Sequence, residues 1–184
     1  MKGGIIISIY IEAERLILKP YCNDDIDNIL KLKSEPLIWK FSTQSSTNSF
    51  DEAEQQLKNT IENYNQNIDT FHAMFLKSTS EYIGEAGILS FKQSNNRAVV
   101  GYNLLPQYWG KGYATEITKA LVKYLFIERD VERIEGLVLE ENIASRKVLE
   151  KSGFFKEGIL RNFTFINNIY KNVCYYGIIK EDYI

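Results

Sequence analysis

Apolar side chains recur along this chain with two different periods, one typical of helices and one typical of strands. An apolar run at residues 14–20 predicts a short buried strand that ends at its proline. Two helices are predicted next. The first is capped by Asn23 or Asp24, and the second begins at Ser49-Phe50-Asp51-Glu52, which has the pattern of a capping box.

The period then changes from helix to strand. Three apolar runs separated by short polar breaks predict an antiparallel meander at residues 71–76, 82–91 and 98–104. The remaining predicted elements are a helix at 112–127, a strand at 134–139, a helix at 142–152, and strands at 159–165 and 173–179. This order predicts an α+β fold in which helices flank a single mixed, mostly antiparallel central sheet.

The residues before the first strand form a separate segment. We expect residues 1–12 to be an N-terminal extension or an extra edge strand, and residues 13–184 to be one domain. The apolar stretch at residues 5–11 is far shorter than the ~20 residues that span a bilayer, and it lacks a cleavage-site pattern. We therefore expect a cytoplasmic protein without a membrane partner, whose edge strand could pair with a second copy in a homodimer.

Composition removes several classes of function. The chain has 184 residues, 22 basic and 24 acidic side chains and a net charge of −2, which disfavours nucleic acid as a partner. Cys22 and Cys174 belong to no C-x-x-C pattern and are expected to be free thiols. His72 lies in an apolar strand-like stretch and is expected to be a packed side chain. Zinc sites and histidine-based hydrolysis are therefore not expected.

The segment from 102 to 116 is the most informative, because a predicted strand enters a glycine-bearing loop that opens a helix. Gly110 and Gly112 allow the backbone to turn several N–H groups toward one point. The helix start adds unpaired N–H groups and the positive end of the helix dipole. This combination predicts a cradle for a phosphate or pyrophosphate, with Lys111 adding charge at its rim.

Two other phosphate-binding motifs fail on this segment. A Walker A loop would need glycine at Leu105 and serine or threonine at Gly112. The dinucleotide fingerprint would need glycine at Thr115. Its ribose-binding acid would be Asp130, which comes before the next predicted strand instead of at that strand's end.

Three segments resemble the GNAT superfamily of N-acetyltransferases. Gln107-Tyr108-Trp109-Gly110-Lys111-Gly112-Tyr113-Ala114 is similar to the family signature Q/R-x-x-G-x-G/A. Residues 142–154, which begin Asn142-Ile143-Ala144-Ser145, resemble the family's N-x-x-S…K-x-G-F helix. Residues 14–20 resemble the opening strand of the RimJ/RimL branch, which acetylates N-termini of ribosomal proteins. The resemblance runs from about residue 13 to the end of the chain.

The resemblance implies acetyl-coenzyme A (acetyl-CoA) as the donor and direct transfer to a primary amine. A protein or peptide N-terminal α-amine is the first expectation, and a small amine such as a polyamine or antibiotic is the alternative. The pantetheine arm would lie between two splayed parallel strands and the pyrophosphate on the loop amides. The residues implied to contact the cofactor are Leu104, Leu105, Gln107, Trp109, Gly110, Lys111, Gly112, Tyr113, Ala114, Asn142 and Ser145.

The chain departs from the family at the usual acid and base positions. Many relatives carry an acid where this chain has Val99 and a tyrosine acid where it has Leu149, and some carry a glutamate where it has Leu137. All three side chains are apolar and cannot exchange a proton. A second class of function therefore stays open, in which the domain binds coenzyme A without catalysis.

Other residues are expected to supply the catalytic groups. Glu85 is the preferred general base, acting directly or through a water molecule, and Glu140 is the reserve. Ser145 is expected to donate a hydrogen bond to the sulfur of the leaving thiol, in addition to its cofactor contact.

Overall fold

The structure is a computed structural model that describes residues 9–183. Residues 1–8, which include most of the apolar N-terminal stretch, lie outside the described part of the chain. The described end of that stretch forms β1 (Ile11–Glu12), which pairs antiparallel with β2 (Leu16–Lys19). The N-terminal segment thus does contribute an edge strand, whereas its pairing with a second copy stays a prediction.

Residues 9–183 contain one sheet of eight strands in the order β1-β2-β3-β4-β5-β6-β8-β7. The other strands are β3 (Phe71–Leu76), β4 (Tyr82–Lys92), β5 (Arg97–Leu104), β6 (Arg133–Leu139), β7 (Phe155–Ile166) and β8 (Ile169–Ile179). Only the β5–β6 pair is parallel, and the six other pairings are antiparallel. The predicted mixed sheet and the meander β3–β4–β5 are confirmed.

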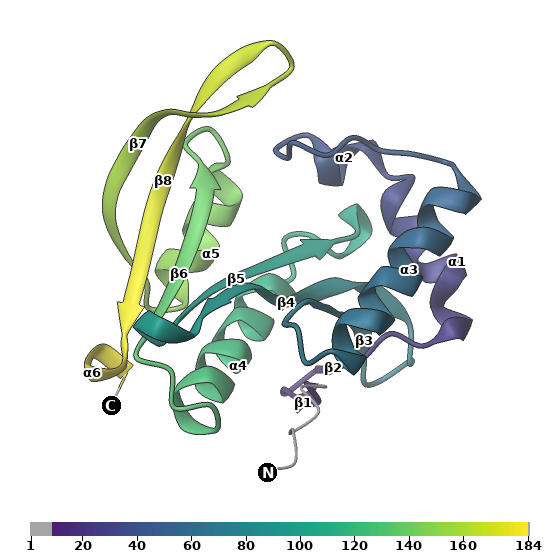
Figure 1. The fold of residues 1–184 in the computed structure, drawn as a ribbon, viewed down its shortest axis with the longest axis horizontal. Helices are drawn as coiled ribbons and strands as arrows, with labels where there is room; N and C mark the ends of the chain where they lie inside the picture. The colour runs from purple at the N-terminus through teal and green to yellow at the C-terminus, as the bar shows by residue number, and fades with distance from the viewer. Residues whose placement is uncertain (1–8, 184) are drawn as a thin grey trace.

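Helices pack against both halves of this sheet. The helices are α1 (Ile26–Lys33), α2 (Pro36–Trp39), α3 (Phe50–Asn65), α4 (Tyr113–Ile127), α5 (Ile143–Lys151) and α6 (Lys180–Tyr183). In Figure 1, α1 and α3 lie beside β3 and β4, whereas α4 and α5 lie beside β5 and β6. The Ser49 hydroxyl accepts a hydrogen bond from the Glu52 N–H at 3.2 Å, which confirms the predicted cap of α3.

The sheet divides between β5 and β6. These strands pair over only three residues, the last pair being Val99 with Glu135. Beyond this point β5 stays paired with β4 as far as Leu104, and β6 stays paired with β8 as far as Leu139. The two halves of the sheet therefore diverge as a V, as Figure 1 shows, and the predicted splay of two parallel strands is confirmed.

A charged network holds the V together at its closed end. The buried carboxylate of Glu135 accepts hydrogen bonds from Arg97 Nη1 at 2.9 Å and from Arg133 Nε at 2.8 Å. Arg133 Nη1 also donates to Glu157 on β7 at 2.8 Å. A Cβ on Gly177 would lie 2.5 Å from Glu157 Oε1, so the ion pair can cross β8 only over a glycine. The network thus ties β5, β6 and β7 into one unit.

The predictions for the cysteines and the histidine are confirmed. Cys22 and Cys174 are free thiols. His72 is buried in β3, where its Nε2 accepts from the Ile9 N–H at 2.9 Å and its Nδ1 lies 3.2 Å from the Thr70 carbonyl oxygen. Burial lowers the pKa of His72 to about 4, so the imidazole is neutral and structural. Within residues 9–183 no helix is both long enough and apolar enough to cross a membrane.

Candidate functional site

The inner edge of β5 is free beyond the closed end of the V. Gly84 on β4 opposes Leu104, and the next residue, Leu105, donates its N–H to the Ile83 carbonyl at 2.9 Å. Successive residues of a strand direct their backbone groups to opposite edges. Leu104 therefore directs its N–H and C=O into the gap between β5 and β6. An extended ligand could pair with this edge as an added strand.

Leu105 does not share this property. Its N–H is bonded to Ile83, and its carbonyl accepts from the Tyr108 N–H at 3.0 Å. Both backbone groups are thus engaged within the protein, and the side chain is buried. The carbonyl of Leu104 accepts from the half-exposed indole of Trp109 at 2.6 Å. Trp109 therefore contacts the free edge of β5.

The glycine loop, residues 109–114, has the geometry of an anion cradle. Gly110 and Gly112 have φ of +74° and +84°, a left-handed conformation that glycine adopts without strain. Among the described residues, the first N–H after Trp109 that donates to the rest of the chain belongs to Glu116, which bonds the Gly112 carbonyl. A Cβ on Gly110 would meet nothing within 4 Å, so the loop has open space beside it. The start of α4 adds its positive dipole end.

The other predicted loop residues lie around this cradle. Gln107 is exposed on the 3-10 turn η3 (Pro106–Tyr108), and Ala114 lies in the first turn of α4. Lys111 is at the rim, with its ammonium 5.4 Å from the centroid of the Tyr108 ring. Tyr113 opens α4, and its ring centroid lies 6.5 Å from that of Tyr108. The structure therefore brings the predicted loop residues together.

Arg15 holds the outer side of the loop and was missed by sequence reasoning. It lies in the turn between β1 and β2, where its Nε donates to Glu116 Oε2 at 2.7 Å. Its Nη1 donates to the Lys111 carbonyl at 3.1 Å, a contact between residues 96 positions apart. The hydrophobic pattern of residues 14–20 does not indicate this contact.

Asn142 and Ser145 lie at the start of α5, on the opposite side of the gap from the loop. Asn142 Oδ1 accepts from the Ser145 N–H at 3.1 Å, so Asn142 is the helix N-cap. Ser145 Oγ accepts from the hydroxyl of Tyr102 on β5 at 3.1 Å. One turn later Leu149 packs on Gly136, where a Cβ would lie 2.7 Å from Leu149 Cδ1. The position at which relatives carry a tyrosine is thus occupied by core packing.

Glu85 is fully buried in β4, with 1% of its surface exposed. Its Oε1 accepts from Asn103 Nδ2 at 2.7 Å, and its Oε2 accepts from the Tyr21 hydroxyl at 3.0 Å. The hydroxyls of Tyr21 and Tyr82 lie 2.7 Å apart. Burial raises the pKa of the Glu85 carboxyl, although the hydrogen bonds from Asn103 and Tyr21 oppose this shift.

The two predicted catalytic residues lie on opposite faces of the sheet. Glu85 and Asn103 are direct cross-strand partners, so their side chains share one face. Tyr102 precedes Asn103 and therefore points to the other face, where it reaches Ser145. A group held in the gap at Leu104 would be approached by Glu85 from one face and by Ser145 from the other.

Two further carboxylates have structural partners. Glu140, the reserve base, lies at the end of β6 and accepts from Asn172 Nδ2 at 2.9 Å. Its backbone N–H also donates to the Asn172 carbonyl at 3.0 Å, so the residue ties β6 to β8. Asp130, the acid of the rejected dinucleotide fingerprint, forms an ion pair with Lys180 in the turn after α4. Neither carboxylate is held at the glycine loop.

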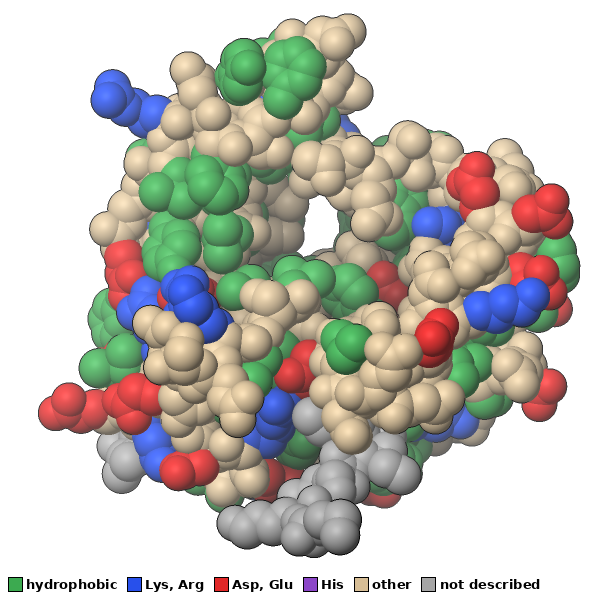
Figure 2. Space-filling view, in the orientation of Figure 1, with side chains coloured by type: hydrophobic (Ala, Val, Ile, Leu, Met, Phe, Trp, Pro, Cys, Tyr) green, Lys and Arg blue, Asp and Glu red, His purple; other side chains and the backbone are tan. Residues whose placement is uncertain are grey.

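The gap continues into an opening through the molecule. Figure 2 shows this opening between the β7–β8 hairpin and the segment that contains α2. Phe41, which follows α2, packs against a cluster formed by the two arms of the hairpin and the end of β6. The members of this cluster are Leu139, Ile166 and Val173, and Leu160 packs against them as well. The contact closes the opening on the side away from the sheet.

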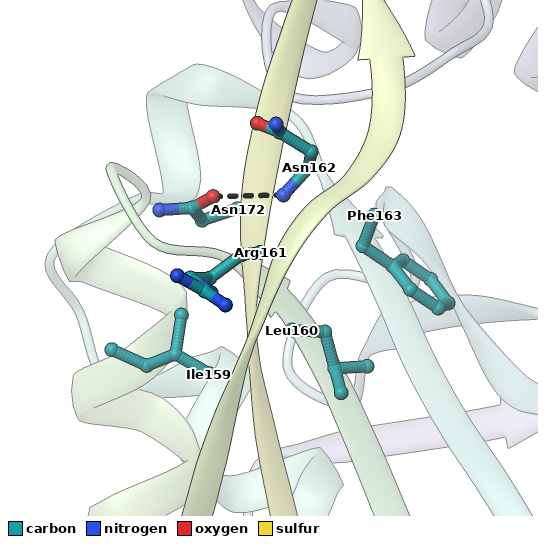
Figure 3. A pocket seen from close by; sticks show the side chains of 6 residues that line it. All are labelled: Ile159, Leu160, Arg161, Asn162, Phe163 and Asn172. Atoms are coloured by element: carbon teal, nitrogen blue, oxygen red, sulfur yellow. Dashed lines mark hydrogen bonds between the residues drawn. The ribbon is translucent and has the colours of Figure 1, made fainter.

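The hairpin presents different residues on its two sides. Figure 3 shows Leu160 and Phe163 on one side of β7, with Ile159 and Arg161 on the other. Leu160 and Phe41 both pack against the cluster formed by Leu139, Ile166 and Val173. Phe163, on the same side of β7 as Leu160, is 56% exposed. The hairpin therefore exposes apolar surface at Phe163, and a hollow of about 740 Å³ lies around residues 159–163 and Asn172.

Comparisons with known proteins agree with this geometry. A family model described as an acetyltransferase (GNAT) domain matches residues 15–155. The uncharacterized N-acetyltransferase YoaA of Bacillus subtilis is 28% identical over 170 residues, which is 92% of this chain and 96% of YoaA. The spermidine N(1)-acetyltransferase of Escherichia coli is 22% identical over 172 residues, 94% of this chain and 90% of that protein.

Solved structures share the fold. The ribosomal-protein-S5-alanine acetyltransferase of Vibrio fischeri superposes with a TM-score of 0.83 at 20% identity. The alignment covers 96% of this chain and 99% of that structure. The two chains therefore share one fold over nearly their whole length.

Proposed function

The chain belongs to the GNAT acetyltransferase family, and we propose that its acceptor is the N-terminal α-amine of a protein or peptide. It is an N-acetyltransferase whose acetyl donor is acetyl-CoA. The acceptor amine attacks the donor directly in this proposal, so the chain needs no nucleophilic side chain of its own.

The residues of the site fit this donor. The free amides of the glycine loop suit a pyrophosphate, and the free edge of β5 at Leu104 suits the extended pantetheine arm. Gly110 leaves open space where the phosphates would lie. When bound, the donor supplies an activated acetyl group as a thioester. Trp109 would cover the arm at the position where it now contacts Leu104.

Glu85 receives the proton of the amine through a water molecule in this proposal. A direct contact is disfavoured because Asn103 and Tyr21 occupy its two oxygens. An α-amine has a pKa of about 7.7–8.0, well above the ordinary value of a glutamate. Burial raises the pKa of Glu85 toward that of the amine. The smaller difference between the two pKa values brings the free energy of the proton transfer closer to zero.

Ser145 donates to the sulfur as the carbon–sulfur bond breaks. A serine hydroxyl has one proton and two lone pairs. Tyr102 donates to one lone pair of Ser145 Oγ, so the serine proton remains available for the sulfur. A hydrogen bond to a developing thiolate lowers the barrier because it stabilises charge that the ground state lacks.

The residues that line the opening determine which acceptor amine is preferred. Phe41, Leu160 and Phe163 make the walls of the opening apolar, and the α2 segment at residues 36–42 contains a lysine but no acid. A polyamine carries several positive charges and needs carboxylates to balance them. A peptide N-terminus has one amine followed by neutral backbone, which suits apolar walls better.

A polyamine is the second candidate, because an E. coli relative is named for spermidine and α3 begins with three acids. Two of these acids, Asp51 and Glu52, lie in the first helical turn, where the positive end of the helix dipole stabilises their negative charge. The third, Glu54, forms an ion pair with Lys58 at 3.1 Å. These contacts give the three acids a structural role, so their presence does not require a polyamine acceptor.

A panel of amines tests the proposal by acetyl-CoA consumption. Peptides with a free N-terminus and an apolar first residue should turn over faster than spermidine, spermine or an aminoglycoside. The same peptides with a blocked N-terminus and one internal lysine should not react. Faster turnover of spermidine would establish the polyamine alternative. Coenzyme A binding without turnover of any amine would establish a non-catalytic module.

A further inference from the structure

Arg15 is fixed at both backbone groups in the β1–β2 turn. Its N–H donates to Glu116 Oε1 at 2.6 Å, and its carbonyl accepts from the Lys77 N–H at 2.9 Å. Its side chain therefore starts from a rigid point between the edge of the sheet and the first turn of α4.

The Arg15 guanidinium group then contacts the outer side of the glycine loop. Besides its bonds to Glu116 and to the Lys111 carbonyl, it lies 4.5 Å above the centroid of the Tyr113 ring. Its Nη2 is 3.4 Å from where a Cβ of Gly112 would lie. One side chain thus lies against three consecutive loop residues, Lys111 to Tyr113, and pairs with Glu116 in the first turn of α4.

The contact with Lys111 determines where an amide points. In a trans peptide the C=O of one residue and the N–H of the next point in opposite directions. Described residues contain no cis peptide, so the peptide between Lys111 and Gly112 is trans. Arg15 holds the Lys111 carbonyl on the outer side of the loop. The N–H of Gly112 must therefore point away from Arg15, into the cradle.

The contact with Glu116 concerns charge. Glu116 lies in the first turn of α4, where the positive end of the helix would meet a phosphate. An unpaired carboxylate at this position would weaken the attraction for an anion. Its side chain is mostly buried, so solvent screens it poorly. The guanidinium of Arg15 neutralises it at 2.7 Å.

We propose that Arg15 is a positioning residue for the pyrophosphate of coenzyme A, which aims the Gly112 N–H into the cradle and cancels the charge of Glu116. The proposal rests on the donor assigned above. It places a determinant of cofactor affinity in the N-terminal turn, outside the two segments whose residues the resemblance assigns to cofactor contacts.

Calorimetric titration with coenzyme A tests this role. Arg15→Gln should weaken binding about tenfold, because it removes charge-assisted hydrogen bonds and leaves the carboxylate unpaired. Arg15→Gln/Glu116→Gln should bind more tightly than Arg15→Gln, since no unpaired carboxylate remains. Arg15→Lys keeps the charge and should lie between Arg15→Gln and the wild type. With a reactive amine, the KM for acetyl-CoA should rise while kcat at saturation changes little.

Lys77→Gln is the matched control. Lys77 lies beside the same turn and pairs with Glu12 at 3.2 Å, but its side chain does not touch the loop, so its loss should leave the affinity unchanged. The proposal is wrong if Arg15→Gln binds like the wild type, or if the double variant binds no better than Arg15→Gln. If Arg15→Gln does not fold, Arg15→Lys must still bind more weakly than the wild type. Failure of the wild type to bind coenzyme A would refute the donor assignment instead.

Discussion

The Tyr102 hydroxyl donates a hydrogen bond to Ser145 Oγ at 3.1 Å, which joins strand β5 to helix α5 across the gap of the sheet. Tyr102→Phe should lower kcat about tenfold, because the serine proton is no longer directed by a bond to its oxygen. Coenzyme A affinity should stay unchanged, as measured by calorimetry. Ser145→Ala should show the same loss, and the double variant should be no slower than Ser145→Ala. Additive losses would show that Tyr102 does not act through Ser145.

Glu85→Gln should reduce kcat about a hundredfold or more, since a general base contributes at least that much to many reactions. The change keeps the size of the side chain and a hydrogen-bonding oxygen. Initial rates at saturating acetyl-CoA measure the effect. Glu140→Gln is the control, because Glu140 is bonded to Asn172 and should retain activity within a few-fold. Equal losses in both variants would contradict the choice of Glu85.

The same substitution should change how stability depends on pH. Burial raises the pKa of Glu85 in the folded chain, so the folded state holds this proton more tightly than the unfolded state. The ionised carboxyl therefore costs stability above its ordinary pKa, and this cost grows until the folded pKa is passed. Relative to wild type, Glu85→Gln should gain melting temperature between pH 4 and pH 7. A constant difference over this range would show that the pKa is not shifted.

His72 should produce the opposite dependence. Burial lowers the pKa of His72 to about 4, so the folded chain binds this proton less tightly than the unfolded chain. Its contribution is fully present above the ordinary pKa of 6.5 and is lost as pH falls toward 4. Wild type should lose up to about 3 kcal/mol more than His72→Gln over this range, as judged by urea unfolding. Parallel pH profiles would contradict the neutral, packed imidazole.

Gly112→Val should abolish binding of coenzyme A. Gly112 has a left-handed φ of +84°, which is strained for a branched residue, and its Cβ would crowd the Arg15 guanidinium. Calorimetry and thermal unfolding together separate loss of binding from loss of folding. Gly158→Ala is the control, because a Cβ there meets nothing within 4 Å and its φ is ordinary. Binding that survives in Gly112→Val would move the pyrophosphate away from this loop.

The sequence predicts elements whose period is complete and misses those that are too short to show one. The meander at β3–β5 and helix α4 each carry several repeats of their period, and all were predicted. Helices α2 and α6 have four residues each, one turn, and have no period to detect.

The same distinction applies to the site, where local sequence patterns could be predicted and contacts between distant segments could not. The glycine loop is a local pattern and could be predicted, whereas Arg15, Tyr102 and Phe41 act through contacts with segments far along the chain. The difference between Leu104 and Leu105 has a related cause. Which residue of a strand faces the gap depends on pairing register, and a shift of one residue reverses it.

The placement of Glu85 and Ser145 on opposite faces of one sheet has a kinetic consequence. In the proposed site the amine would approach from the face of Glu85 and the thioester from the face of Ser145, so neither substrate would obstruct the path of the other. This arrangement predicts random order of addition, in which each product can leave before or after its counterpart. Coenzyme A would then compete with acetyl-CoA alone, and the amine would not relieve that inhibition.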